Sequence, residues 1–322
     1  MAAYDPRGDA LYRAGAEYDV RVLEPSPPAV LAEPFSDDPT ARGTTQPGRA
    51  LVSPVTDGDV TWDDLCRERP ELAPWCAPRW LGAWPRLRPL PPPDVFATTL
   101  DSWHTLAQHV IAGTRHRTNG KIGLRFVRGG FGTPFFGDDE EVRVVGGGIV
   151  RTIGDEQQRA PITTLGNAAV FLHVGIGVPG ELFTPTTDGD AKRTLAIDSE
   201  AANVLADWYG FATSVLAQLR VDLANGAPSL VQLWPEHFDV AIDAGNDAAG
   251  SRAGFGASPG DEAHPEPYLY VSAWKPDRVD RSDPYWNESF GASLPYEQLR
   301  DAPDQRQAAF TFFRHGAEAL GR

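Results

Sequence analysis

The sequence predicts an α+β protein whose body consists of two units, each a helix followed by an antiparallel sheet. Two observations predict this class. Each recognisable pair of strand patterns is joined by a short turn, as in antiparallel sheets. An amphipathic helix pattern also precedes each strand-rich segment. We expect an extended Pro-rich arm over residues 1–95, a first α+β unit over 96–190 and a second over 191–322.

The predicted arm differs in composition from the rest of the chain. Residues 1–58 are rich in Pro, Gly and Asp and have no helical or alternating apolar period, so we expect an extended segment. Residues 61–84 contain Trp62, Trp75, Trp80 and Trp84. We expect these tryptophans to anchor a loop-rich segment to the body, and an aromatic surface that stacks a planar or cationic ligand is the alternative. The run P-L-P-P-P-D at 89–94 predicts a polyproline spacer.

Charge and motif content limit the partners. The chain has 44 acidic and 29 basic residues, a net charge of −15, and no long run of Lys or Arg, so neither nucleic acid nor an anionic membrane is an expected partner. We expect a small-molecule or protein partner and no cofactor, because phosphate-loop and dinucleotide-binding motifs are missing from the sequence. No export signal or long apolar run is recognisable, so we expect a cytoplasmic location, with Cys66 and Cys76 unbonded.

The first unit begins with an amphipathic helix. Thr99 or Asp101 is the expected cap of a helix that reaches about His116. Its buried stripe should comprise Trp103, Leu106, Ala107, Val110 and Thr114. His104, His109 and His116 differ by five and seven positions, so they form no i,i+4 ligand pair and are expected to be exposed or amphipathic.

Strand patterns follow this helix. Residues 121–127 predict a strand, and residues 141–153 predict a hairpin around 146–148. The glycine-rich segment 128–139 lacks G-K-[ST] and opens no helix, so we expect a bulged connection between strands and not a phosphate loop.

The second unit has the strongest helix and strand patterns. Asp198 begins a helix whose apolar residues cover more than one stripe, so the helix should be largely buried. The stretch 230–243, L-V-Q-L-W-P-E-H-F-D-V-A-I-D, then predicts the central strand. Counting by twos gives an apolar face of Trp234, Phe238, Val240 and Ile242 and a polar face of His237, Asp239 and Asp243. Pro235 predicts an edge position, a bulge or a kink.

Three further elements complete this unit. Residues 267–274 predict a strand with Leu269 and Val271 on one side and Tyr268, Tyr270 and Ser272 on the other. Residues 291–299 predict a last short strand. A C-terminal helix should start at Asp301 or Ala302.

A weak internal repeat accompanies the two units. G-F-G-T-P-F-F-G-D-D-E from Gly130 matches G-F-G-A-S-P-G-D-E from Gly254 with a gap of two residues. A true repeat would imply two similar halves related by a pseudo-twofold axis, and a chance match of glycine-rich turns is the alternative.

Four ordered motifs resemble a known family. They are D-S-W-H at 101–104, W-P-E-H-F-D-V-A at 234–241, E-P-Y-L-Y at 266–270 and L-P-Y-E at 294–297. The chain resembles an uncharacterised, mainly actinobacterial protein family with strands of the form W-x-x-x-F-D-[LV]-A and E-P-x-[FY]-x-Y and with L-P-Y-E before a C-terminal helix. The resemblance covers roughly residues 96–322, implies the α+β architecture and implies no activity.

One group of polar residues is the candidate site. It comprises His237, Asp239, Asp261, Glu262 and His264, which lie on and after the central strand. His and carboxylate side chains on one sheet face suit a metal or an acid/base pair, so we predict these residues to be ligand-binding. A solvated sheet face beside an acidic turn is the alternative, and the sequence designates neither a catalytic residue nor a metal.

Two classes of function follow from this group. The first is a small-molecule-binding or structural protein without catalysis, which fits the lack of catalytic motifs in the sequence. The second is a metal-assisted, hydrolase-like enzyme that uses His237, Asp239 and His264. Convergence of these three side chains would distinguish the two.

Overall fold

The structure is a computed structural model, and it describes residues 86–127, 129–134, 136–137, 140–153, 156–229 and 231–321. The predictions for the arm before residue 86, for its tryptophans and for Cys66 and Cys76 lie outside the described residues. The described part confirms the α+β class: helices accompany two five-stranded antiparallel sheets.

One long helix opens the first unit. It comprises α4 (Pro93–Leu106), the π-helical turn η4 (Ala107–Ile111) and α5 (Ala112–Asn119), and it ends at Gly120, whose φ of 75° is the left-handed conformation that glycine favours. The helix starts before the predicted cap because Pro93 stands in its first turn, where a missing N–H breaks no hydrogen bond. The predicted stripe is confirmed by the burial of Trp103, Leu106, Ala107, Val110 and Thr114.

The first sheet is an antiparallel meander. Its elements are β1 (Arg125–Val127), β2 (Gly130–Gly132), β3 (Glu140–Val145), β4 (Gly148–Ile153) and β5 (Glu156–Pro161), followed by α6 (Leu165–Leu172). The predicted hairpin around 146–148 is confirmed. The glycine-rich segment is more than a connection, because it contains β2. A Cβ on Gly130 would lie 1.8 Å from Val144 O, so only glycine allows this strand to approach β3 so closely.

The second unit repeats this arrangement. Its elements are α7 (Ser199–Asp222), η5 (Ala224–Gly226), β6 (Gln232–Trp234), β7 (Asp239–Ala244), β8 (Ala253–Ser258), β9 (Tyr268–Ala273), η6 (Pro276–Arg278), β10 (Gly291–Pro295), α8 (Tyr296–Asp301) and α9 (Gln305–Leu320). Asp198 caps α7 as predicted and accepts hydrogen bonds of 2.9 Å from the amides of Glu200 and Ala201. The last helix starts later than predicted, because Asp304 supplies its cap.

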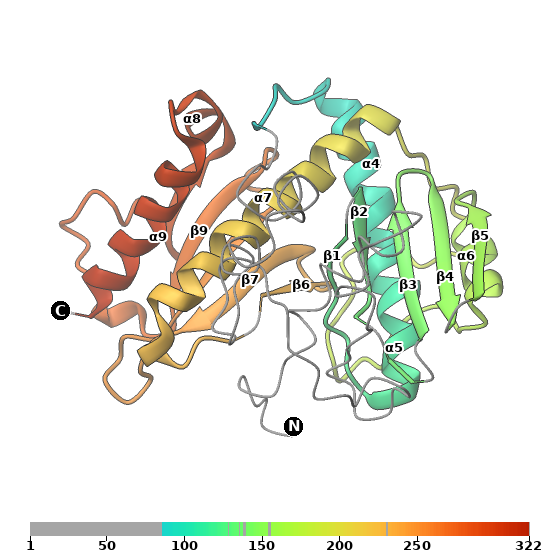
Figure 1. Cartoon of the computed structure of the whole chain (residues 1–322), viewed down its shortest axis with the longest axis horizontal. Helices are drawn as coiled ribbons and strands as arrows, with labels where there is room; N and C mark the ends of the chain where they lie inside the picture. The colour runs from blue at the N-terminus through green and yellow to red at the C-terminus, as the bar shows by residue number, and fades with distance from the viewer. Residues whose placement is uncertain are drawn as a thin grey trace, which may run out of the picture.

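A backbone bridge between two leucines joins the two sheets. Leu124, directly before β1, and Leu233 of β6 exchange two backbone hydrogen bonds of 2.8 Å. Helix α7 contacts β1 and β2 of the first sheet and β7 and β8 of the second. Figure 1 shows it running diagonally across the junction, with α8 and α9 beside the second sheet. Contact with both sheets explains why the apolar residues of α7 cover more than one stripe.

Strand register divides the second sheet into two faces. Val240, Phe255 and Leu269 belong to the buried apolar face, where Phe255 contacts Phe313 of α9 with ring centroids 6.2 Å apart. The predicted alternation in β9 is confirmed, because Tyr268 and Tyr270 lie on the opposite, polar face. The residues of the polar face are Gln232, Trp234, Asp239, Ala241, Asp243, Gly254, Gly256, Ser258, Tyr268, Tyr270, Ser272, Gly291, Ser293 and Pro295.

The stretch predicted as a central strand is a hairpin. Trp234 of β6 pairs with Asp239 of β7, and residues 235–238 form the turn between them. Phe238 has a φ of 57° and donates its amide to Trp234 O at 2.7 Å. The face count is therefore wrong across the turn, because Trp234 shares the polar face with Asp239. At Pro235, where an edge position, a bulge or a kink was predicted, the chain reverses, and β6, which ends one residue earlier, is the edge strand of its sheet.

Element order agrees with a duplicated architecture, but the repeated sequence motif does not mark equivalent strands. A long helix, a five-stranded meander and a further helix occur twice in the described residues. The matched G-F-G segments lie in β2, the second strand of its sheet, and in β8, the third strand of its sheet. The match therefore gives no support to a duplication, which stays a prediction, as do the unit boundaries at 95/96 and 190/191.

Candidate functional site

Two aromatic side chains with polar groups hold the turn between β6 and β7. His104 of α4 donates from Nε2 to Pro235 O at 3.1 Å and to Glu236 O at 3.2 Å, and its ring stacks on Phe238. Tyr209 of α7 donates to Phe238 O at 2.7 Å. Burial lowers the pKa of His104 to about 4, against the opposing effect of the two carbonyls, so the ring is neutral at pH 7.

Gln108, in the π-helical turn, links this hairpin to the segment before α7. Its Nε2 donates to Glu236 O at 2.9 Å and to Thr186 Oγ1 at 3.1 Å. Its Oε1 accepts from the amides of Thr186 and Thr187 and from Thr187 Oγ1. Gln108 is fully buried and each of its polar atoms is bonded, so its role is to position the hairpin.

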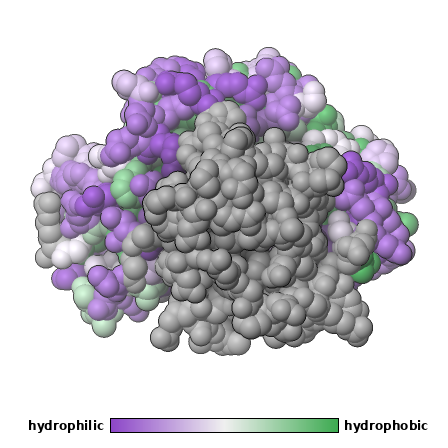
Figure 2. Space-filling view, in the orientation of Figure 1, coloured by the Kyte–Doolittle hydropathy of each residue, from purple (hydrophilic) through white to green (hydrophobic). Residues whose placement is uncertain are grey.

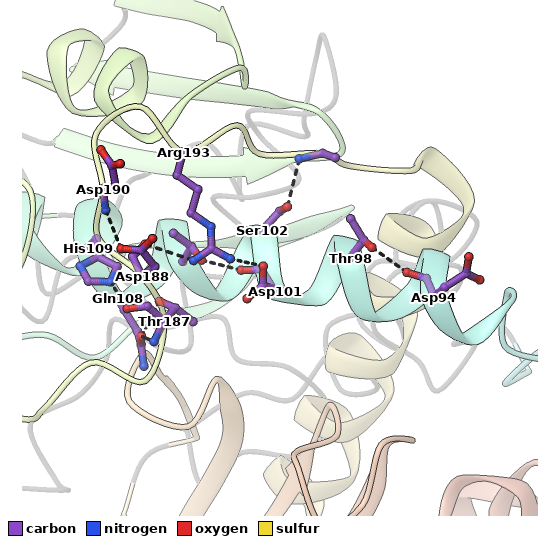
Figure 3. Close-up of polar contacts among 12 residues, drawn as sticks. Asp94, Thr98, Asp101, Ser102, Gln108, His109, Thr187, Asp188, Asp190 and Arg193 are labelled. Carbon is purple, nitrogen blue, oxygen red and sulfur yellow. Dashed lines mark hydrogen bonds and ion pairs between the residues drawn. The ribbon is translucent and has the colours of Figure 1, made fainter.

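The same segment is tied to α4 by charged and polar side chains (Figure 3). Arg193 forms an ion pair with Asp101 and donates to Asp188 O at 3.1 Å. His109 hydrogen-bonds Thr187 O at 3.0 Å and is only 6% exposed. The prediction that His104 and His109 are exposed or amphipathic is therefore wrong for His109 and incomplete for His104, because backbone carbonyls satisfy both rings inside the protein.

Asp239 is the buried carboxyl group of the polar face. It is 5% exposed, and Tyr270 of β9 donates a hydrogen bond to its Oδ2. Its Oδ1 has no hydrogen-bond partner in the described part of the chain. Burial raises the pKa of Asp239, and the hydrogen bond from Tyr270 and the nearby His237 only partly oppose that rise. An open, buried acceptor costs about 1–3 kcal/mol, so a ligand that donates to Asp239 Oδ1 would recover part of that cost.

Tyr270 reaches Asp239 by lying across β8. It stands opposite Gly256, and a Cβ on that glycine would lie 2.3 Å from Tyr270 Cζ. The missing side chain of Gly256 thus makes room for the ring. Burial raises the pKa of the Tyr270 hydroxyl well above its usual value, so this group keeps its proton and acts as a donor to Asp239.

A second polar group lies beside this pair. Tyr268 donates to Asp261 Oδ2 at 2.6 Å, and Asp261 Oδ1 accepts from the amides of Ala263 and His264 at 2.8 Å. Burial would raise the pKa of Asp261, but these hydrogen bonds outweigh it and lower the pKa. The His264 ring lies 4.8 Å from that of Tyr268, and its Nε2 is 3.3 Å from Glu288 Oε1.

An exposed tryptophan lies beyond the far end of the polar face. Trp274 is 52% exposed and donates from Nε1 to Asp243 Oδ1 at 3.1 Å. The Arg252 guanidinium stands 4.8 Å above its ring. The described residues visible in Figure 2 are mainly hydrophilic, with scattered apolar residues. Trp274 is one of four exposed large apolar side chains in the described part of the chain.

The structure brings some of the predicted site residues together and leaves others apart. Asp261 and His264 both contact Tyr268. Tyr270 lies between this group and Asp239, and its ring centroid is 6.3 Å from that of Tyr268. The His237 side chain lies on the hairpin turn, 73% exposed, and Glu262 is exposed. His237 is near enough to Asp239 to influence its pKa, but Tyr270 separates Asp239 from the group at His264, so the three side chains are not all in contact, and the hydrolase-like enzyme stays a prediction.

Several residues that contribute here were not among the predicted site residues, including Gln108, Tyr268, Tyr270, Trp274 and Glu288. The tyrosines were correctly placed on the polar side of β9, and their spacing of two was the available signal. Nothing local in the sequence indicates Gln108 or Glu288, because their partners lie far away along the chain.

Neither a metal site nor a membrane-spanning helix accompanies these residues in the described part of the chain. Among the described residues, no group of three or more His, Cys, Asp and Glu side chains is placed to hold a metal ion. None of the described helices combines the length and apolar character needed to cross a membrane. No family model matches the chain, and comparison with curated proteins and with solved structures finds no match. The resemblance to the actinobacterial family stays a prediction.

Proposed function

We propose that the protein is a binding protein without catalysis, and that the polar face of the second sheet binds a cationic group, an amine or a guanidinium, of a small molecule or of a protein partner. The observation that carries this proposal is Asp239. Its carboxyl group is buried, its pKa is raised, and one oxygen has no partner among the described residues. A cation at that oxygen would supply both the missing hydrogen bond and the missing charge.

The surroundings of Asp239 support this choice of ligand. Tyr268, Tyr270 and Trp274 line the same side of β9 and its continuation, and aromatic rings attract cations. The contact between Arg252 and Trp274 is an example within the chain. Asp261 and Glu288 add carboxyl groups nearby, and the net charge of −15 attracts cations from a distance.

A thermal-shift panel on the full chain tests the proposal. The probes are arginine amide, spermidine and a short Arg/Lys-rich peptide, each compared with a neutral or anionic counterpart of similar size at the same ionic strength. We expect the cationic probes alone to raise Tm. Stabilisation by the peptide alone would assign a protein partner, whereas stabilisation by the small amines would assign a small molecule.

Two variants make the test specific. Asp239→Asn keeps the shape of the side chain and removes its charge, so it should abolish the cation-dependent rise in Tm. Glu156→Gln removes one charge from an exposed position on β5 of the first sheet, and it should bind like the wild type. Equal responses of wild type and Asp239→Asn would overturn the proposal.

A further inference from the structure

The polar face of the first sheet contains a buried cluster of charged side chains. Arg125 of β1 donates to Glu141 Oε1, and Arg143 of β3 places its Nε 3.2 Å from Glu141 Oε2. The three side chains are between 0% and 3% exposed. Register puts them on one face, because Gly132 pairs with Arg125 on one side and with Arg143 on the other.

Arg143 shares the one carboxylate that balances its charge. Among the described residues it forms no ion pair other than that with Glu141, and Glu141 is also bound by Arg125. Removing a poorly compensated charge from water is strongly unfavourable. A further negative charge beside Arg143 would therefore be stabilising.

Unpartnered polar atoms accompany the charge of Arg143. Among the described residues, Nε, Nη1 and Nη2 of Arg143 have no hydrogen-bond partner, and neither does Oε2 of Glu141. Thr152 of β4 is 5% exposed, and its Oγ1 also finds no partner in the described part of the chain. Thr152 stands directly opposite Glu141, so its side chain lies on the same face within a few ångströms of the cluster. Arg125 differs from Arg143 in this respect, because its Nε donates to Thr133 O and its Nη1 donates to Phe126 O.

We infer that this cluster is a binding site for a single carboxylate group. The two Nη groups of Arg143 form a planar fork that matches the two oxygens of a carboxylate, and the Thr152 hydroxyl can donate a third hydrogen bond. One negative charge complements the partly balanced Arg143. A phosphate dianion would place two negative charges beside the Glu141 carboxylate, so the cluster selects a carboxylate over a phosphate. This site is separate from the proposed cation site, because it lies on the other sheet.

The test uses the full chain with sodium acetate and sodium phosphate, each against sodium chloride at matched ionic strength. Acetate at several times its dissociation constant should raise Tm by roughly 2 °C, and phosphate should raise it less. Isothermal titration calorimetry should give one site for acetate. A lack of any acetate effect relative to chloride would overturn the inference, and so would a larger effect of phosphate.

Three variants separate binding from folding. Arg143→Met keeps the aliphatic stem and removes the charge, so the acetate response should vanish while Tm in chloride does not fall. Thr152→Val should weaken acetate binding about fivefold, because it removes one neutral hydrogen bond. Arg159→Met is the matched control, since Arg159 is exposed on β5 in the same row as Arg143, and it should respond like the wild type. An Arg143→Met variant that still responds to acetate would contradict the site. If Arg143→Met is less stable than the wild type in chloride, and acetate has no effect on the wild type, the cluster is purely structural.

Discussion

His104 makes the fold sensitive to acid. Burial lowers the pKa of its imidazole from 6.5 to about 4, so between these values the unfolded chain binds more protons than the folded protein. Stability should therefore fall as pH drops from about 6.5 to 4, by up to roughly 3 kcal/mol. Urea unfolding at several pH values should show this loss, and His104→Gln, which keeps a donor for the two carbonyls, should reduce it. His116→Gln, at a half-exposed position on α5, is the control and should keep the wild-type dependence.

The titration of Asp239 should change the stability of the fold with pH in the opposite direction to that of His104. Burial raises its pKa above the usual 3.8, so the folded protein holds this proton more tightly than the unfolded chain does. Its ionisation therefore destabilises the fold as pH rises from 3.8 through the raised pKa. Asp239→Asn has no charge to bury and should be no less stable than the wild type at pH 7.5, although it loses the cationic ligand. Chemical unfolding of the two proteins at pH 4.5 and 7.5 measures this, and a large loss of stability at pH 7.5 would show that the carboxylate is structural.

Gly256 of β8 leaves the space that the Tyr270 ring of β9 occupies. Gly256→Ala would place a Cβ 2.3 Å from Tyr270 Cζ, so the ring must leave the sheet and release Asp239. We expect a loss of about 2 kcal/mol in unfolding free energy and the loss of cation binding. Gly254→Ala on the same strand is the matched control, because its Cβ would meet Asp243 Oδ1 at an ordinary 3.5 Å. Thermal unfolding and the response to the cationic probes should distinguish the two variants. Equal Tm values and equal responses would mean that the Tyr270 ring can move aside without losing its contact with Asp239.

Elements with a local signal could be predicted from the sequence. The alternation of Leu269 and Val271 with Tyr268 and Tyr270 identified β9 and its polar face, and Asp198 identified the start of α7. The hairpin at Pro235 could not be predicted as such, because no residue type there signals the positive φ of Phe238.

The candidate site could be predicted only in part, for a related reason. Asp239, Asp261 and His264 belong to local polar patterns. The contact of His104 with Pro235 O joins residues 131 positions apart, and that of Tyr270 with Asp239 joins residues 31 positions apart. Such pairings depend on strand register and helix packing, which a periodic pattern of single residues does not specify.

The whole molecule should unfold as one unit despite its two sheets. Phe131 of β2 contacts Trp103 of α4 and Phe238 of the second unit, with ring centroids 5.5 and 4.9 Å apart. The leucine pair and α7 add further contacts across the junction. Phe131→Ala should therefore cost about 3–5 kcal/mol and shift a single transition. Tryptophan fluorescence and far-UV circular dichroism in urea should coincide before and after the change, and two separate transitions would show that the sheets are independent.

The most direct test of the central claim, that Asp239 receives a cation, is calorimetric titration of the full chain with arginine amide at pH 6 and pH 8, in buffers of different ionisation enthalpy. A cation beside the carboxyl group favours its ionised form, so binding lowers the raised pKa of Asp239 and releases protons. We expect the wild type to release protons on binding and to bind more tightly at pH 8 than at pH 6, as long as the carboxyl group is not already ionised in the free protein. Asp239→Asn should lose about tenfold or more in affinity and should release no protons. Binding of arginine amide that is equally tight in the wild type and in Asp239→Asn, with no proton release in either, would contradict the claim.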